Sequence, residues 1–132
     1  MAQAQLRVTD GWPKVVGSFG KREDLRAAGA SGVRACCDIA EIRLDLIMTG
    51  TGGEDPSPWR HLQDVPLLFT ARRQDEGGAR TSSAAARMAL LEPTLDQAAW
   101  IDLEVASIGE MGALLQDLAG RNIPWIASCH DF

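Results

Sequence analysis

The chain has 132 residues, a formal net charge of −5 and a hydrophobic fraction of 45%, which together predict one domain with one core. Basic and acidic residues are interspersed, so the chain has no basic stripe for a nucleic-acid backbone, and no apolar run reaches the roughly 20 residues of a membrane span. We therefore expect a soluble cytoplasmic protein with no nucleic-acid or membrane partner. Cys36, Cys37 and Cys129 form neither an even set nor a CxxC pair, which favours reduced thiols.

Short apolar runs alternate with helix-forming segments along the chain. Residues 5–8, a turn at Asp10 and Gly11, and residues 14–19 predict an N-terminal hairpin whose second arm is the first core strand. The predicted core strands are residues 14–19, part of 36–48, 67–71, 99–105 and 123–129, and the predicted helices are residues 22–33, 59–63 (capped by Ser57), 81–91 and 111–118. This alternation is typical of right-handed βαβ units on a parallel sheet.

The stretch PLLFTARRQDEGG, residues 66–78, changes character abruptly. Its first half is a continuous apolar run over 67–71, which is typical of a strand buried on both faces. The run is followed at once by Arg72, Arg73, Asp75 and Glu76 and by two glycines. In barrels of parallel strands and helices, the active site lies where the strands end and the next loops begin. We therefore interpret these charges as part of an active site.

The alternation of side chains along a strand sorts the polar residues onto one face. The residues that share it are Ser18 in the first strand, Glu41, Arg43 and Asp45 in the second, Thr70 and Arg72 in the third, Asp102 and Glu104 in the fourth, and Ser128 and His130 in the fifth. An open sheet with helices on both sides would bury each charge at a cost of several kcal/mol, whereas a barrel gathers them at its polar mouth. The pattern favours a (β/α) barrel over a doubly wound sheet.

Other interpretations of these residues stay open. Arg72 and Glu76, four residues apart, also fit an ordinary surface ion pair, and His130 also fits a hydrogen-bonded core histidine. A metal-dependent barrel enzyme would use Glu41, Asp45, Asp102, Glu104 and His130 as ligands of a divalent ion. Arg43 and Arg72 argue against the metal, because two cations in one mouth repel a metal ion and attract an anionic substrate.

Five segments resemble the type I 3-dehydroquinate dehydratases of the shikimate pathway. They are PKVVGSFGK at 13–21, DIAEIRLDL at 38–46 (the family's ExRxD strand), PLLFTARRQDEGG at 66–78 (its FTxRxxxEGG strand and loop), WIDLE at 100–104 and IASCHDF at 126–132 (its S-x-HDF strand). The segments follow the family's order over nearly the whole chain. The resemblance implies a partial TIM (β/α)8 barrel of about five parallel strands, forming a single domain over residues 1–132.

The resemblance also implies a chemistry. The family is a lyase that dehydrates 3-dehydroquinate to 3-dehydroshikimate through a lysine Schiff base, with no metal or organic cofactor, and the Schiff base makes the neighbouring carbon acidic. Carried over residue by residue, His130 would be the general acid and base, oriented by Glu76. The substrate's hydroxyls and carboxylate would be held by Glu41, Arg43, Arg72 and Ser18, with Asp102 and Glu104 as supporting residues behind them.

The chain departs from the family at its nucleophile. The family's Schiff-base lysine lies on the sixth strand, whereas this sequence ends at Phe132, after the fifth. Its lysines are Lys14 and Lys21, neither at the nucleophile's place, and Lys21 also fits an exposed loop residue. We therefore expect an incomplete or impaired enzyme. Because the first and fifth strands would be open edges, we expect a second copy or a complementary polypeptide to cover them.

Two functional hypotheses follow. The first is a 3-dehydroquinate dehydratase-like chain that supplies the acid–base residues and part of the substrate site. The second is a non-catalytic, truncated relative that binds a hydroxylated carboxylate or acts as an interaction module.

Overall fold

The computed structural model describes residues 11–48, 54–62 and 64–132. Five strands form one parallel sheet in chain order: β1 (Val16–Phe19), β2 (Ile39–Arg43), β3 (Leu67–Thr70), β4 (Trp100–Glu104) and β5 (Trp125–Ser128). The predicted parallel α/β architecture is therefore confirmed. The first arm of the predicted hairpin lies outside the described residues.

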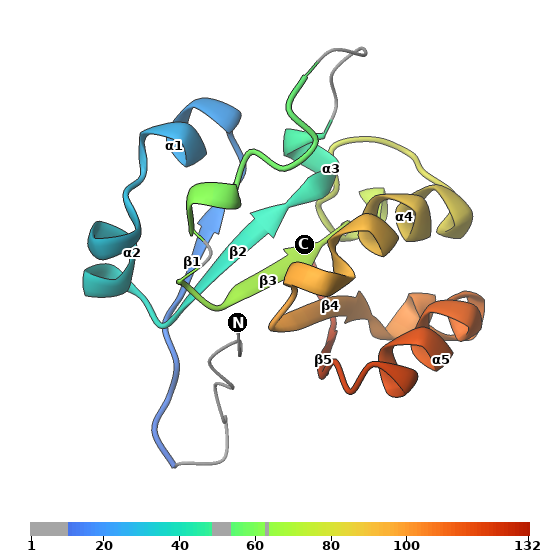
Figure 1. Cartoon of the computed structure of the whole chain (residues 1–132). Helices are drawn as coiled ribbons and strands as arrows, with labels where there is room; N and C mark the ends of the chain where they lie inside the picture. The colour runs from blue at the N-terminus through green and yellow to red at the C-terminus, as the bar shows by residue number, and fades with distance from the viewer. Residues whose placement is uncertain (1–10, 49–53, 63) are drawn as a thin grey trace.

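The connections between the strands are short helices and 3-10 turns. The helices are α1 (Arg22–Ala27), α2 (Ala30–Cys36), α3 (Leu44–Ile47), α4 (Ala84–Leu91) and α5 (Gly112–Gly120), and the 3-10 turns are η2 (Arg60–Leu62), η3 (Gln74–Glu76), η4 (Glu92–Gln97) and η5 (Val105–Glu110). Figure 1 shows α1 and α2 beside β1 and β2, and α4 and α5 beside β4 and β5. None of the helices in the described ranges is long and apolar enough to cross a bilayer.

Several predicted boundaries are wrong, for local reasons. The single helix predicted over 22–33 is two helices, because Ala28 and Gly29 adopt extended backbone angles between them. The strand predicted within 36–48 is confirmed as Ile39–Arg43, but Asp45, predicted on the same strand, lies in α3 because α3 begins at Leu44. The helix predicted over 59–63 is the single turn η2, and it is the carbonyl of Ser57, rather than its hydroxyl, that accepts from the Arg60 amide.

One face of the sheet builds the hydrophobic core. The outward-facing side chains include Ala40, Ile42, Leu67, Phe69, Ile101 and Leu103, each at most 3% exposed, and they pack against helical residues such as Leu25, Leu91, Leu114 and Leu118. The Phe69 ring meets Trp59 edge to face, with centroids 5.0 Å apart. Because successive side chains of a strand point to opposite faces, the polar residues of the same strands lie on the opposite, inner face.

Strand register aligns the inner polar residues into rows. Ser18 pairs with Glu41, Arg43 with Thr70, and Thr70 with Asp102 as Cα partners. Among the described residues, β1 and β5 each pair with one neighbour only, and both alternate between exposed and half-buried positions, whereas β3 is buried throughout. The sheet therefore has two open edges and a polar inner face between them.

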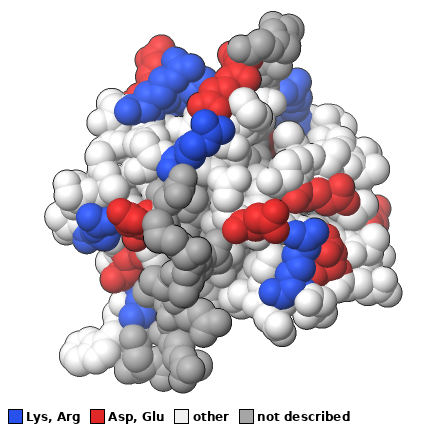
Figure 2. Space-filling model, viewed as in Figure 1, with Lys and Arg blue, Asp and Glu red and all other residues white. Residues whose placement is uncertain are grey.

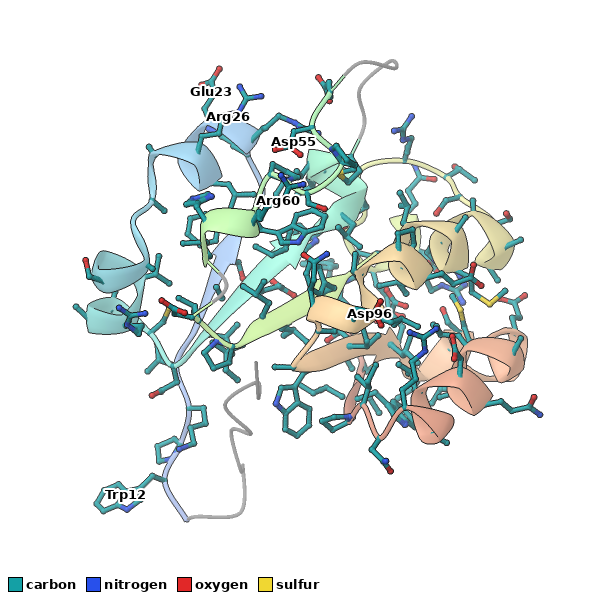
Figure 3. All side chains as sticks on the ribbon, in the orientation of Figure 1. Trp12, Glu23, Arg26, Asp55, Arg60 and Asp96 are labelled. Carbon is teal, nitrogen blue, oxygen red and sulfur yellow. The ribbon has the colours of Figure 1, made fainter. Side chains whose placement is uncertain are left out.

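The charges outside this face are of both signs. Figure 2 shows basic and acidic side chains interspersed on the visible surface. Exposed ion pairs join Arg60 to Asp55, both labelled in Figure 3, and Arg121 to Asp96. Exposed ion pairs of this kind contribute roughly 0–1 kcal/mol each, so they do not explain the fold.

Candidate active site

The carboxyl ends of the strands and the loops that follow them form the mouth, and Arg72 occupies its centre. Directly after β3, Arg72 is 5% exposed, and its Nη1 donates to Asp102 Oδ1 and Ser128 Oγ, both at 2.8 Å. Glu104 Oε1 lies 3.4 Å from the same nitrogen, and Glu41 Oε2 lies 3.9 Å from Nη2. A buried guanidinium is tolerated because several acceptors surround it. Arg72 thus links residues of β2, β4 and β5.

Glu41 organises the other side of the inner face. Ser18 Oγ donates to Glu41 Oε1 at 2.6 Å, and Thr70 Oγ1 donates to Glu41 Oε2 at 2.7 Å. Both carboxylate oxygens therefore accept a hydroxyl from an adjacent strand. Ser18, Glu41 and Thr70 thus form a row of hydrogen-bonded polar side chains across three neighbouring strands.

Arg43 and Asp45 form a second, outer pair. Arg43 Nε and Nη2 lie 3.0 and 2.8 Å from the two oxygens of Asp45, a bidentate arrangement, and Nη2 also donates to the Gly77 carbonyl at 3.2 Å. The hydrogen bond to Asp45 raises the pKa of the Arg43 guanidinium further above its ordinary value. Asp45 also accepts from the backbone amides of Arg72 and Ala79. Asp45 thus fixes the loop after β3 to the end of β2.

Glu76 and His130 meet across the mouth. Glu76 Oε1 accepts from the His130 backbone amide at 2.8 Å and lies 3.2 Å from His130 Nδ1. Because an ionised carboxylate only accepts, this contact favours the tautomer in which Nδ1–H donates to Glu76, and in the neutral imidazole Nε2 is then the acceptor. The His130 ring also stacks on Phe132, with centroids 6.4 Å apart. Two contacts therefore orient the imidazole.

Two glycines shape the loop that carries Glu76. Gly77 has φ +93°, in the left-handed region, and a side chain there would meet the Phe132 ring at 3.1 Å. At Gly78 a Cβ would lie 2.3 Å from the Arg72 carbonyl and 2.6 Å from Arg73 backbone atoms. The loop thus turns back against its own backbone, which a glycine permits.

The remaining candidates lie apart from this network. Lys21 is exposed at the N-cap of α1, just after β1. Within the described ranges no group of three or more His, Cys, Asp or Glu side chains is arranged to hold a metal ion. The five residues of the metal hypothesis do not converge, because Arg72 lies among Glu41, Asp102 and Glu104 while Asp45 is engaged by Arg43.

Sequence reasoning missed two buried polar residues behind the mouth, Ser107 and Arg87. Ser107 is fully buried in η5 and Arg87 is 4% exposed in α4. The sequence feature that could have indicated Ser107 is its spacing of three residues from Glu104, because a 3-10 turn brings residues i and i+3 together.

The burial of Asp102 yields a pH prediction for Asp102→Asn. Burial raises the pKa of Asp102, against the opposing effects of Ser128 and Arg72. Folding therefore favours the protonated carboxyl of Asp102. The stabilisation that this gives is fully present below the pKa of about 3.9 in the unfolded chain, and it is lost as pH rises through the raised pKa in the folded chain. Asparagine keeps an acceptor and cannot ionise. In urea denaturation, the free energy of unfolding of the variant relative to the unmodified protein should rise between about pH 4 and pH 7.

Asp75→Asn is the control of opposite sign. The side-chain hydrogen bond from Arg73 holds the pKa of Asp75 below its ordinary value, so its stabilisation is present above the unfolded pKa and is lost at lower pH. The relative free energy of unfolding of this variant should fall slightly as pH rises through about 4, since Asp75 is exposed. A difference for Asp102→Asn that is flat or falls with pH would contradict the assignment.

The close approach at Gly78 predicts a second outcome. In Gly78→Ala the loop must move away from its own backbone, which separates Glu76 from His130. We expect lower thermal stability and a changed His130 ring signal in NMR spectra. Gly112→Ala is the matched control, because a Cβ in α5 meets nothing within 4 Å, and it should keep or raise stability by roughly 0.5–1 kcal/mol. Equal effects of the two variants would rule out this role of Gly78.

Comparison with known sequences agrees with this geometry. The family model described as type I 3-dehydroquinase matches residues 19–132. A 3-dehydroquinate dehydratase of Methanocella arvoryzae is 31% identical over 123 residues, which cover 91% of this chain and 52% of the relative. One of Haloquadratum walsbyi is 31% identical over 103 residues, covering 72% of this chain and 42% of the relative. The chain thus spans about half the length of the curated relatives it matches.

Solved structures of 3-dehydroquinate dehydratases also match this chain over about half of their own length. The 3-dehydroquinate dehydratase of Enterococcus faecalis superposes with a TM-score of 0.74 at 27% identity, over 96% of this chain and 57% of that one. The type I enzyme of Clostridium difficile gives a TM-score of 0.75 at 24% identity, over 93% of this chain and 53% of that one, and at that identity the likeness concerns the fold alone. The predicted partial TIM barrel is confirmed. With its motifs, its fold and a match over residues 19–132, the chain belongs to the type I 3-dehydroquinase family.

Proposed function

We propose that this chain supplies the acid–base part of a 3-dehydroquinate dehydratase site, which converts 3-dehydroquinate to 3-dehydroshikimate and water. The observation that carries the proposal is the contact of Glu76 Oε1 with both the amide and Nδ1 of His130. It presents Nε2 of a half-buried imidazole to the mouth, where it takes the proton beside the substrate's ketone and returns it to the leaving hydroxyl. The contact with Glu76 and the ordinary acid–base chemistry of histidine support this role for His130.

The proposed substrate contacts use the row of polar side chains on the inner face. Ser18 and Glu41 would hold substrate hydroxyls, and Arg43 and Arg72 the carboxylate. Arg43 is the more accessible arginine, with 19% of its side chain exposed against 6% for Arg72. The outer end of the ligand would therefore meet Arg43, and its inner end the groups around Arg72.

The chemistry also needs an amine for the Schiff base. The sequence offers Lys14, Lys21 and the N-terminus, and a partner polypeptide is the other source. Among the described residues β1 and β5 each pair with one neighbour only, which favours a partner, because unpaired strand edges are costly to leave uncovered. We propose a second copy or a complementary polypeptide of the same family, in a cytoplasmic shikimate-pathway enzyme.

One observation favours a second function, in which the chain binds a hydroxylated carboxylate without turning it over. Lys21 is exposed and none of the hydrogen bonds described for the inner face includes it. Without a nucleophilic amine, the proton beside the ketone is not acidic enough for His130 to remove at a useful rate. The side chains of Glu41, Arg43 and Arg72 would still bind the ligand.

The test is to incubate the purified chain with 3-dehydroquinate, add borohydride, and look for a reduced adduct by intact mass while following the enone absorbance of 3-dehydroshikimate. The same assay is repeated after adding the C-terminal half of the Methanocella arvoryzae relative. Adduct plus product supports the enzyme function, and the mass identifies which chain carries the amine. Binding by calorimetry with neither signal supports the second function. Folded protein that neither reacts nor binds would reject both.

For a reacting sample, His130→Ala should lower turnover by about 10²–10⁴-fold, the usual contribution of a general acid–base group, and leave substrate affinity largely unchanged. His61→Ala is the matched control, because the His61 ring bonds the carbonyls of Leu25 and Ala28 on the outer side and takes no part in the mouth. Equal rates for His130→Ala and the unmodified chain would show that another group moves the proton.

A further inference from the structure

Behind the mouth, one buried hydroxyl joins three charged side chains. Ser107 Oγ donates to Glu104 Oε2 at 3.3 Å and accepts from Arg87 Nη2 at 3.3 Å and Arg73 Nη1 at 3.4 Å. Ser107 is 0% exposed, Glu104 1% and Arg87 4%. Polar groups buried this deeply must form their hydrogen bonds with one another, because water is not available as a replacement partner.

Glu104 is held at both of its oxygens. Oε1 faces the mouth, where it accepts from the Arg73 amide at 2.9 Å and lies 3.4 Å from Arg72 Nη1. Oε2 faces away from the mouth, toward Ser107. Because η5 starts directly after β4, its first turn returns Ser107 to the back of the Glu104 carboxylate. The carboxylate is thus fixed between Arg72 and Ser107.

The charges around Glu104 favour further arginines behind it. On the inner face the buried Arg72 is shared by three carboxylates, those of Glu41, Asp102 and Glu104. The buried Arg87 and the partly exposed Arg73 bring positive charge to the far side of Glu104, both through the Ser107 hydroxyl. Arg87 is anchored to the Ser82 carbonyl at 2.6 Å, while its Nε has no hydrogen-bond partner among the described residues. That unpaired N–H is a cost, which a second function of the side chain offsets.

We infer that Ser107 and Arg87 are positioning residues, which hold Glu104 against Arg72 and so keep the Arg72 guanidinium in place for the substrate's carboxylate. The ligand side of the inference rests on the proposed function. The positioning of Arg72 does not, and it is measurable without substrate. Removing the hydroxyl leaves Glu104 fixed at one oxygen only, and its neighbour Arg72 then gains freedom to move.

The experiment measures two quantities in the full chain: the dissociation constant of 3-dehydroquinate by calorimetry, and the solvent-exchange rate of the Arg72 guanidinium protons by NMR. In Ser107→Ala we expect affinity to fall and Arg72 exchange to rise, each about tenfold, the size of one hydrogen bond to a charged group. Arg87→Met should act in the same direction, whereas Arg87→Lys, which keeps the charge, should restore most of the loss.

Thr94→Val is the matched control. Thr94 is another buried hydroxyl, 2% exposed, and it donates to the Leu91 carbonyl rather than to Glu104. Its loss should lower stability and leave both quantities unchanged. Unaltered Arg72 exchange in Ser107→Ala, or an equal change in Thr94→Val, would overturn the inference. If the unmodified chain binds no 3-dehydroquinate, the proposed function fails, and Arg72 exchange alone then decides the inference.

Discussion

The inner face of the sheet depends on the burial of one guanidinium. Arg72 is 5% exposed, yet it lies among Glu41, Asp102, Glu104 and Ser128, so its charge is balanced by groups from β2, β4 and β5. Removing the Arg72 guanidinium would leave Glu41, Asp102 and Glu104 without the cation that they share, and the loss of one partner from a buried ion pair typically costs about 3–5 kcal/mol. The arrangement thus ties non-neighbouring strands together by side chains, in addition to the backbone ladder that joins neighbours.

The two faces of the sheet therefore have separate tasks. The outward side chains are apolar and hold the helices, while the inward ones form a connected polar layer that ends at the mouth. Glu76 follows β3 and His130 follows β5, and they meet because the loop after β3 reaches past the end of β4. The rigid sheet positions the imidazole through loops that Asp45 and the glycines constrain. The apolar face thus packs against the helices, and the inner face carries the hydrogen-bonded polar residues.

Sequence patterns predicted the strands and their polar faces because a period of two is a direct property of extended backbone. The sharing of one face by Glu41 and Arg43, and by Asp102 and Glu104, followed from that period alone. Helix ends were less predictable, since the break at Ala28 and Gly29 depends on local backbone angles. Ser107 and Arg87 were missed because their roles arise only after η5 and α4 pack behind β4.

The strand order 1-2-3-4-5 has a consequence for how the chain folds. Each strand pairs with the one made just before it, so the sheet can grow in the order of synthesis, and each step closes only the crossover between consecutive strands. The Glu76 to His130 contact, by contrast, spans 54 residues and must wait for β4 and β5. The Glu76–His130 contact therefore forms after β1 to β5 have paired, later than the contacts between neighbouring strands.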